Sequence, residues 1–281
     1  MIDTHAHLIS DDLEKYRPQP LSGTLRAGDL DDPMTAERLL REMDRHKVER
    51  ALLVQRAHVY GYDNSYVADM AARYPDRFRA VAVIDALGPD AGKTADHWIG
   101  ERGVAGIRLT EPFKGAGTDW FASAETERVW ASIAGHRAFL CLQLYRWNRI
   151  DCIAALPGLL KRYPDVRVMI DHMTSLVEDG PPDFGFDAAL MSLQQNPNVY
   201  LKFTTINFSR AMAKGIDTAE LLAKAVECYG ASRLMWGSDV AQSPQSYAEM
   251  TGMARSATRA FEEPIRRSLL SGTAGSFFGG E

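Results

Sequence analysis

The 281-residue chain has the length of one large α/β barrel or of two modest domains. Hydrophobic residues make up 46% of it and charged residues 25%, which are ordinary globular values and exclude disorder, collagen-like repeats and a disulfide scaffold. The 32 Lys and Arg residues against 37 Asp and Glu residues give a net charge of −5, so the composition offers no positive field for a nucleic acid backbone.

Short apolar runs alternate with amphipathic helical patterns along the whole chain, a rhythm typical of parallel strands wrapped by helices. The eight predicted strands span residues 1–8, 49–55, 78–86, 104–109, 138–145, 166–171, 198–206 and 233–239. Helical patterns begin at Thr35, Asn64, Ala124, Ile150, Phe186 and Thr218, with Thr218 as the expected N-cap of the last helix and Gly230 as its stop. No linker divides the chain, so the sequence predicts one (β/α)8 TIM-barrel domain over residues 1–281, with its active site at the carboxyl ends of the strands.

The segment 9–34 interrupts this rhythm directly after the first predicted strand. It is rich in Asp, Pro and Gly and is long for a connection between a strand and a helix. The sequence leaves two interpretations open, a cover over the active site or a solvated insertion.

Two further features bear on cellular location. Cys141, Cys152 and Cys228 are odd in number and share no CxxC spacing, which favours free thiols in a reducing compartment. No apolar run approaches the roughly 18 residues that span a bilayer, and the N-terminus lacks a basic region followed by an apolar stretch. We therefore expect a cytoplasmic protein that binds neither membrane nor nucleic acid, and the sequence leaves open whether it forms a homo-oligomer.

Candidate metal-binding side chains begin in the first predicted strand. His5 and His7 are two residues apart, so they project to the same face near its carboxyl end, a geometry suited to chelating Zn²⁺ or a similar ion. Asp3 shares their face and is expected either to orient them or to be a satisfied buried carboxylate. Two imidazoles do not complete a metal site, so further ligands must come from other strands.

Polar residues also end two later strands. His172 follows the sixth predicted strand and is expected to act as a ligand or catalyst, whereas Asp171 beside it is expected to point to the opposite face. Asp239 closes the eighth strand after Gly237 and Ser238, small residues that permit a tight bend. It is the best candidate for a general base that takes a proton from water and returns it to a leaving group. The structural alternative is an N-cap of the following helix.

The segments DTHAHL at 3–8, DHM at 171–173 and WGSD at 236–239 resemble the amidohydrolase-related family of metal-dependent or metal-derived TIM barrels. The resemblance extends over nearly the whole chain, through YGYDNSY at 60–66 and GIRL at 106–109. It implies that His5 and His7 form the first-strand pair of the site, with His172 as its sixth-strand histidine and Asp239 as its eighth-strand aspartate. These residues are then the expected ligands of one divalent ion.

The chain departs from many metal-dependent members of that family at two strands. The fifth predicted strand ends without a histidine and offers Gln143, Tyr145 and Arg146 instead. The fourth has Arg108 in place of a lysine or carboxylate that could bridge two ions. A two-metal centre is therefore not expected, whereas one divalent ion, with Zn²⁺ as its expected identity, and a metal-free site both remain open.

These departures make the chain resemble the lactonase branch of the family, which opens cyclic esters. The resemblance implies that Asp239 and His172 activate water, that His5, His7 or a bound ion polarises the ester carbonyl, and that Tyr145 donates a hydrogen bond to the developing oxyanion. A rival hypothesis is a mononuclear metal-dependent nonoxidative decarboxylase of an aromatic or conjugated acid. A third, from a different class, is a non-catalytic barrel that binds a small acid.

Basic side chains favour a small anionic substrate. Arg56 follows the second predicted strand, Arg108 lies in the fourth and Arg146 follows the fifth, and a guanidinium suits a carboxylate. His58, in the loop after the second strand, and Lys202, in the seventh, complete the expected substrate-binding set. The alternative for each residue is an ordinary packing or salt-bridge role.

Overall fold

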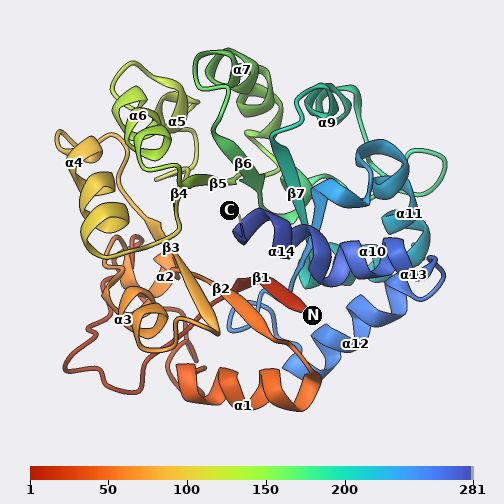
Figure 1. The fold of residues 1–281 in the computed structure, drawn as a ribbon, viewed down its shortest axis with the longest axis horizontal. Helices are drawn as coiled ribbons and strands as arrows, with labels where there is room; N and C mark the ends of the chain where they lie inside the picture. Colours follow the sequence, from red (N-terminus) through yellow and green to blue (C-terminus); the bar gives the residue numbers. More distant parts are fainter. Residues whose placement is uncertain (280–281) are drawn as a thin grey trace.

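Eight parallel strands are hydrogen-bonded in the order of the sequence in the computed structural model, which describes residues 1–279 (Figure 1). The last strand approaches the first, because Ala6 and Val240 form a parallel bridge and the Asp239 backbone N–H donates to the His5 carbonyl at 2.7 Å. The strands are β1 (Ile2–Ala6), β2 (Arg50–Val54), β3 (Phe78–Val83), β4 (Gly106–Thr110), β5 (Phe139–Gln143), β6 (Arg167–Ile170), β7 (Val199–Thr204) and β8 (Leu234–Gly237). The predicted (β/α)8 barrel is confirmed.

Most helices surround the strands on the outside of the barrel, and the last one lies across one end of it (Figure 1). They are α1 (Ala36–His46), α2 (Ala57–Tyr60), α3 (Ser65–Arg73), α4 (Ala91–Asp96), α5 (Asp119–Ala122), α6 (Glu127–Gly135), α7 (Arg149–Arg162), α8 (His172–Ser175), α9 (Ala188–Ser192), α10 (Thr205–Ala213), α11 (Thr218–Tyr229), α12 (Tyr247–Thr258), α13 (Glu263–Arg267) and α14 (Thr273–Phe278). Short 3-10 or π turns lie at His97–Glu101, Leu193–Gln195, Ala231–Arg233 and Ser268–Gly272.

The helix ends follow local capping chemistry. Thr35 caps α1, because its side chain accepts a hydrogen bond from the Arg38 backbone N–H at 3.2 Å. Helix α11 starts as expected at Thr218, but the cap is the preceding Asp217, whose side chain accepts from the Ala219 backbone N–H at 2.7 Å. The expectation that Thr218 is the cap was therefore wrong by one residue. Gly230 ends α11 with a φ of +72°, as expected of a helix stop.

The interior of the barrel is filled at its amino-terminal end. Apolar side chains from the strands form a buried cluster with Ala274 and Phe277 of α14, and the strand members are Ile2, Leu52, Val81, Phe139, Cys141, Met169 and Met235. Helix α14 crosses in front of the barrel near the N-terminus in Figure 1. It therefore closes this end, and only the carboxyl ends of the strands are left to form an open mouth.

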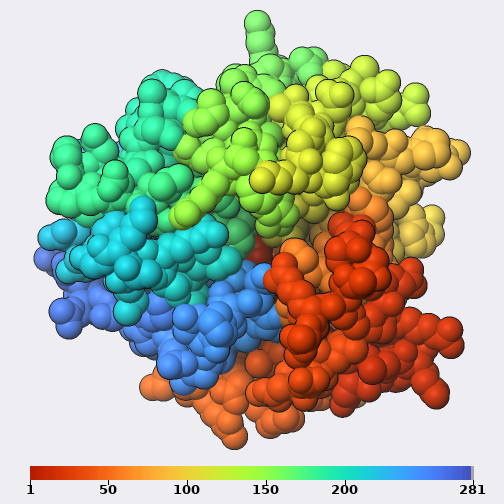
Figure 2. Space-filling view, turned by 180° about the vertical axis from the view of Figure 1, so that it is seen from behind, coloured from red at the N-terminus to blue at the C-terminus, as the bar shows by residue number. Residues whose placement is uncertain are grey.

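The face opposite α14 is hollowed near its centre, with the N-terminal segment along one side of the hollow (Figure 2). Residues 9–34 belong to that segment and are tied down by side chains, because the Tyr16 hydroxyl donates to Asp69 at 2.7 Å and Asp29 pairs with Arg56 at 2.9 Å. Leu21 and Arg26 line a cavity at the mouth. Of the two interpretations of this insertion, the structure supports a cover over the site.

Two further expectations bear on the chain as a whole. Cys141, Cys152 and Cys228 are free cysteines, as expected. Within the described residues, no helix combines the length and the apolarity needed to cross a membrane.

Candidate active site

A cavity of about 190 Å³ opens at the carboxyl ends of the strands, and we call it the inner chamber. Its lining includes His7, His172 and Asp239, with Arg108 and Tyr145 on its walls. A second cavity of about 510 Å³, the outer chamber, shares Arg108 and Tyr145 with it, so the two adjoin. The structure thus brings the predicted polar residues of β1, β6 and β8 together at one mouth.

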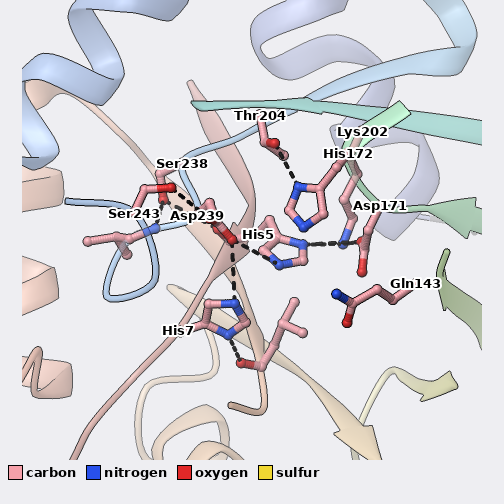
Figure 3. Close-up of polar contacts among 12 residues, drawn as sticks. His5, His7, Gln143, Asp171, His172, Lys202, Thr204, Ser238, Asp239 and Ser243 are labelled. Carbon is pink, nitrogen blue, oxygen red and sulfur yellow. Dashed lines mark hydrogen bonds and ion pairs between the residues drawn. The ribbon is translucent and has the colours of Figure 1, made fainter. Parts of the chain in front are cut away.

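His5 lies fully buried at the end of β1, between two carboxylates (Figure 3). Its Nδ1 is 3.2 Å from Asp171 Oδ1, and its Nε2 is 3.5 Å from Asp239 Oδ1. Gly237 of β8 packs directly against His5, because a Cβ at residue 237 would lie only 2.6 Å from the His5 Cβ and would clash with it. The glycine of the WGSD segment therefore lets β8 approach the histidine closely, in addition to preceding the bend at Asp239.

His7 and His172 are each fixed through one ring nitrogen. His7 Nδ1 lies 2.7 Å from the Val54 carbonyl, which can only accept, so this nitrogen carries the proton. His172 Nδ1 lies 2.7 Å from the Thr204 hydroxyl, which in turn donates to Asn207 Oδ1 at 3.3 Å. The hydroxyl therefore accepts from His172. In the neutral form of each ring the proton is on Nδ1, which leaves the Nε2 lone pair available as a ligand.

Asp239 presents one carboxylate oxygen to these imidazoles. Its backbone has a φ of +62°, and its Oδ2 accepts from the Ser243 hydroxyl at 2.8 Å. Its Oδ1 lies 3.6 Å from His7 Nε2 and 3.5 Å from His5 Nε2. Among residues 1–279, neither Asp239 Oδ1 nor His5 Nε2 has a hydrogen-bond partner. The alternative N-cap role does not apply, because α12 begins at Tyr247.

These donors fit a divalent cation. One ligand atom from each of His5, His172 and Asp239 lies within 4.8 Å of the others. Imidazole nitrogen and carboxylate oxygen are ligands that Zn²⁺ accepts, and a cation there would satisfy the two buried atoms that lack partners. His7 lies outside this group of three, yet its Nε2 faces the same carboxylate oxygen.

Protonation at neutral pH follows from burial and charge. Burial would raise the pKa of Asp239, but the contact with His7 and the neighbouring His172 and His5 lower it to about 2. Burial lowers the pKa of His172, and it lowers that of His5 well below the ordinary 6.5. The site therefore combines the ionised carboxylate of Asp239 with neutral imidazoles at His5 and His172.

Asp171 also enters the site, so the expectation that it points to the opposite face was wrong. Asp171 is still extended, with φ −69° and ψ 146°, and has the parity of Met169, which points into the barrel interior. Residues 172–175 then all have positive φ, with His172 at +51°, so alternation stops after Asp171 and His172 reaches the site as well. Asp171 is fully buried and pairs with Lys202 Nζ at 3.0 Å and with Arg108 Nε at 2.9 Å. Burial would raise its pKa, but Lys202, His5 and Arg108 hold it well below the ordinary value. Asp171 is an anion that fixes His5.

The expected substrate-binding residues separate into two groups. Arg108 and His58 line both chambers, as does Tyr145, the expected hydrogen-bond donor to the oxyanion. Burial, with the neighbouring arginines, lowers the pKa of His58 to about 4, so its ring is neutral at pH 7. The Tyr145 hydroxyl lies 3.1 Å from the Thr110 hydroxyl at the chamber wall.

The other three cations are occupied by partners in the protein. Arg56 reaches the inner chamber but is paired with Asp29 and hydrogen-bonded to the Ala241 carbonyl. Arg146 pairs with Glu178 and lines neither chamber. Lys202 is fully buried beneath Asp171 and lines neither chamber. For Arg146 and Lys202 the structure therefore replaces expected substrate contact with ion pairs inside the protein.

Like Arg26, Arg210 is a cation of the inner chamber that the sequence analysis missed. It lies in α10 and lines the inner chamber together with Ile206, four residues earlier. Its Nη1 is enclosed and has no hydrogen-bond partner within the described part of the chain. The spacing of one helical turn directly after the seventh strand is the signal that could have identified it.

Comparisons with known proteins agree with this geometry. An amidohydrolase family model matches residues 2–280. An L-fucono-1,5-lactonase from Burkholderia ambifaria is 28% identical over 251 residues, which cover 85% of this chain and 79% of that protein.

Three solved structures share the fold over 99% of this chain. A Pseudomonas putida protein that carries the name 2-pyrone-4,6-dicarboxylic acid hydrolase has a TM-score of 0.75 at 23% identity, with 97% of that chain covered. A zinc-bound amidohydrolase from Burkholderia multivorans has a TM-score of 0.75 at 19% identity, with 98% covered. A 2,6-dihydroxybenzoate decarboxylase from Rhizobium has a TM-score of 0.71 at 14% identity, with 99% covered.

At these identities the structural likenesses show the TIM-barrel fold, and the family model shows the family. The motifs at residues 3–8, 171–173 and 236–239, on which the resemblance was based, supply the three imidazoles and the carboxylate that meet at the mouth. The chain belongs to the amidohydrolase family.

Proposed function

We propose that the protein hydrolyses a carboxylate-bearing lactone or a related cyclic ester. The observation that carries the proposal is the geometry of Asp239, whose buried Oδ1 has no hydrogen-bond partner among the described residues and faces the imidazoles at the wall of a cavity. Such a group can accept a proton from water as the water attacks a carbonyl. The similarity to an L-fucono-1,5-lactonase supports a cyclic ester as the substrate.

The reaction divides among the residues of the inner chamber. Water adds to the ester carbonyl while Asp239 takes its proton, and the Tyr145 hydroxyl donates a hydrogen bond to the oxyanion. The C–O bond to the ring oxygen then breaks, and Asp239 returns the proton to the alkoxide that leaves. The product is an open-chain hydroxy acid.

Carbonyl polarisation needs a positive group, which the neutral imidazoles of His5 and His172 do not provide. A divalent ion held by His5, His172 and Asp239 would supply a Lewis acid for the carbonyl. The chain prepares the donors itself: Val54 and Thr204 hold the protons of His7 and His172 on Nδ1.

Binding of the substrate carboxylate is assigned to Arg210, with Arg108 on the same wall. Arg210 is the better candidate because its Nη1 has no partner in the described residues, whereas Arg108 is paired with Asp171. A guanidinium and a carboxylate form a strong charge-assisted pair.

The test is turnover of a panel of lactones with and without a carboxylate, by the wild type and by Asp239→Asn. We expect turnover of the acidic lactones to fall by at least about 10²-fold in Asp239→Asn, the lower range for loss of a general base. Unchanged turnover would refute the proposal. Release of CO2 from an aromatic acid would identify the protein as a decarboxylase, and binding of acids without turnover would identify a non-catalytic barrel.

A further inference from the structure

The outer chamber contains an aromatic platform that the hydrolytic chemistry does not use. The Tyr145 and Trp147 rings are stacked nearly parallel, with their centroids 4.6 Å apart and their planes 7° from each other. Trp147 remains 53% exposed although it lines the chamber. Phe113, 66% exposed, lines the same chamber.

Trp147 is held rigidly in this exposed position. Its indole N–H donates to Glu111 Oε2 at 2.6 Å, and Glu111 is itself buried. The other Glu111 oxygen accepts from the backbone N–H groups of Gly115 at 2.9 Å and Ala116 at 3.2 Å. An exposed aromatic ring that is fixed through both its edge and one face is prepared to stack against a ligand, because little side-chain freedom remains to be lost on binding.

The charge of the outer chamber selects an anion. Glu111 is the only acid among its lining residues within 1–279, and both of its oxygens are occupied. The lining contains the cations Arg26, Arg108 and Lys114, and the Lys114 ammonium lies 5.2 Å from the centre of the Trp147 ring. The wall therefore offers aromatic faces and positive charge, with no free carboxylate to bind sugar hydroxyls.

The sizes of the chambers indicate that a substrate spans both. The inner chamber, at about 190 Å³, is smaller than the roughly 300 Å³ at which small-molecule sites begin. The outer chamber adds about 510 Å³ and is joined to it through Arg108, Gln143 and Tyr145. A substrate that reacts beside Asp239 can thus extend past Tyr145 onto Trp147.

We propose that the outer chamber is a subsite for a planar aromatic group, so that the substrate is an aryl-bearing anionic lactone or ester. This assignment rests on the proposed hydrolysis for its reacting carbonyl, and it adds the class of the distal group. Trp147 and Phe113 bind the aryl ring, and the positive charges of Lys114 and Arg26 attract the anionic substrate.

The experiment measures binding by isothermal titration calorimetry and does not require turnover. The probes are 2-naphthoate and its saturated counterpart decahydro-2-naphthoate, which share a skeleton and a charge but differ in planarity. The variants are Trp147→Ala and Trp147→Phe. Met212→Ala is the control, because Met212 is 60% exposed and lines neither chamber. Thermal unfolding of each variant verifies that it is folded.

We expect the wild type to prefer naphthoate by about fivefold or more, the size of one aromatic contact. Trp147→Ala should abolish this preference, Trp147→Phe should retain most of it, and Met212→Ala should leave it unchanged. Equal binding of the two probes by the wild type, or an unchanged preference in Trp147→Ala, would overturn the assignment. Tighter, Trp147-dependent binding of gluconate than of naphthoate would overturn it in favour of a sugar-acid subsite.

Failure of the proposed hydrolysis has a different signature. If Asp239→Asn leaves lactone turnover unchanged, the proposed role of Asp239 in hydrolysis is refuted, whereas the preference for naphthoate remains. If Asp239→Asn abolishes turnover and the preference is absent, only the aromatic subsite falls.

Discussion

Replacing Arg210 by methionine tests how the inner chamber recognises an anion. Arg210 is half-buried, lines the chamber and has an enclosed Nη1 without a hydrogen-bond partner in the described residues. No described acid lies within ion-pair distance of it, and the nearby Glu178 keeps Arg146 as its partner when Arg210 is removed. The variant Arg210→Met should therefore fold with a stability close to that of the wild type.

The expected effect is confined to acidic substrates. A hydrogen bond to a charged group contributes about 1.5–3 kcal/mol, which corresponds to roughly a 10- to 100-fold loss of kcat/KM for carboxylate-bearing lactones. Neutral lactones of the same ring size should lose less than about threefold, because they lack the group that Arg210 binds. Arg210→Lys should restore part of the loss, since an ammonium keeps the charge but not the planar fork.

The assay is steady-state hydrolysis of paired acidic and neutral lactones, with Arg41→Met as the matched control. Arg41 is an exposed arginine of α1 outside both chambers. Equal losses on acidic and neutral substrates, or no loss on either, would refute the reasoning that an unpaired guanidinium selects the substrate.

Three further predictions follow from the buried charges. Lowering the pH from 7 to 5 should lower the Tm of the protein. The folded state holds the pKa values of His5 and His172 below 6.5, so these residues take up protons near pH 6.5 only in the unfolded state. The variant His172→Gln should therefore show a smaller change of Tm with pH. Lys202→Met should lower the free energy of unfolding, measured by urea denaturation, by about 3 kcal/mol, because it removes one buried partner of Asp171 while Arg108 remains. A decrease below about 1 kcal/mol would contradict the importance of this ion pair. Metal analysis of the purified protein should find about one divalent ion per chain and less in His5→Ala, and equal content in both would place the ion elsewhere.

The barrel could be predicted from the sequence because its strands are short apolar runs bounded by helical patterns. Each of the eight predicted runs contains the corresponding observed strand or most of it, and the family motifs placed His5, His172 and Asp239 at strand ends that meet. Parallel strands in a barrel deliver their carboxyl ends to one mouth whatever the details of the loops.

The errors at the site arose where local backbone geometry departs from a regular strand. Because His172 was taken as the inward-facing residue, alternation placed Asp171 on the far face. In the structure Asp171 follows the inward-facing Met169 by two residues, and four consecutive residues with positive φ after Asp171 bring His172 to the site as well. No local pattern announces such a turn, because none of residues 172–175 is a glycine.

The substrate-binding arginines show a second limit of sequence reasoning. Arg56 and Arg146 were expected to hold substrate, yet Asp29 and Glu178 pair with them, and both acids are distant in the sequence. Pairing of this kind depends on tertiary contacts that spacing does not reveal. Arg210, left without such a partner among the described residues, could be recognised only once the chamber was known.

The most direct test of the account follows the oxygen of water into the product. An acidic lactone is turned over in H2¹⁸O by the wild type and by Asp239→Asn, and the product is analysed by mass spectrometry. The account predicts a hydroxy acid that carries one ¹⁸O in its new carboxylate, formed at a rate at least about 10²-fold lower in the variant. Incorporation at the same rate without the Asp239 carboxylate, or a product that has lost CO2, would contradict it.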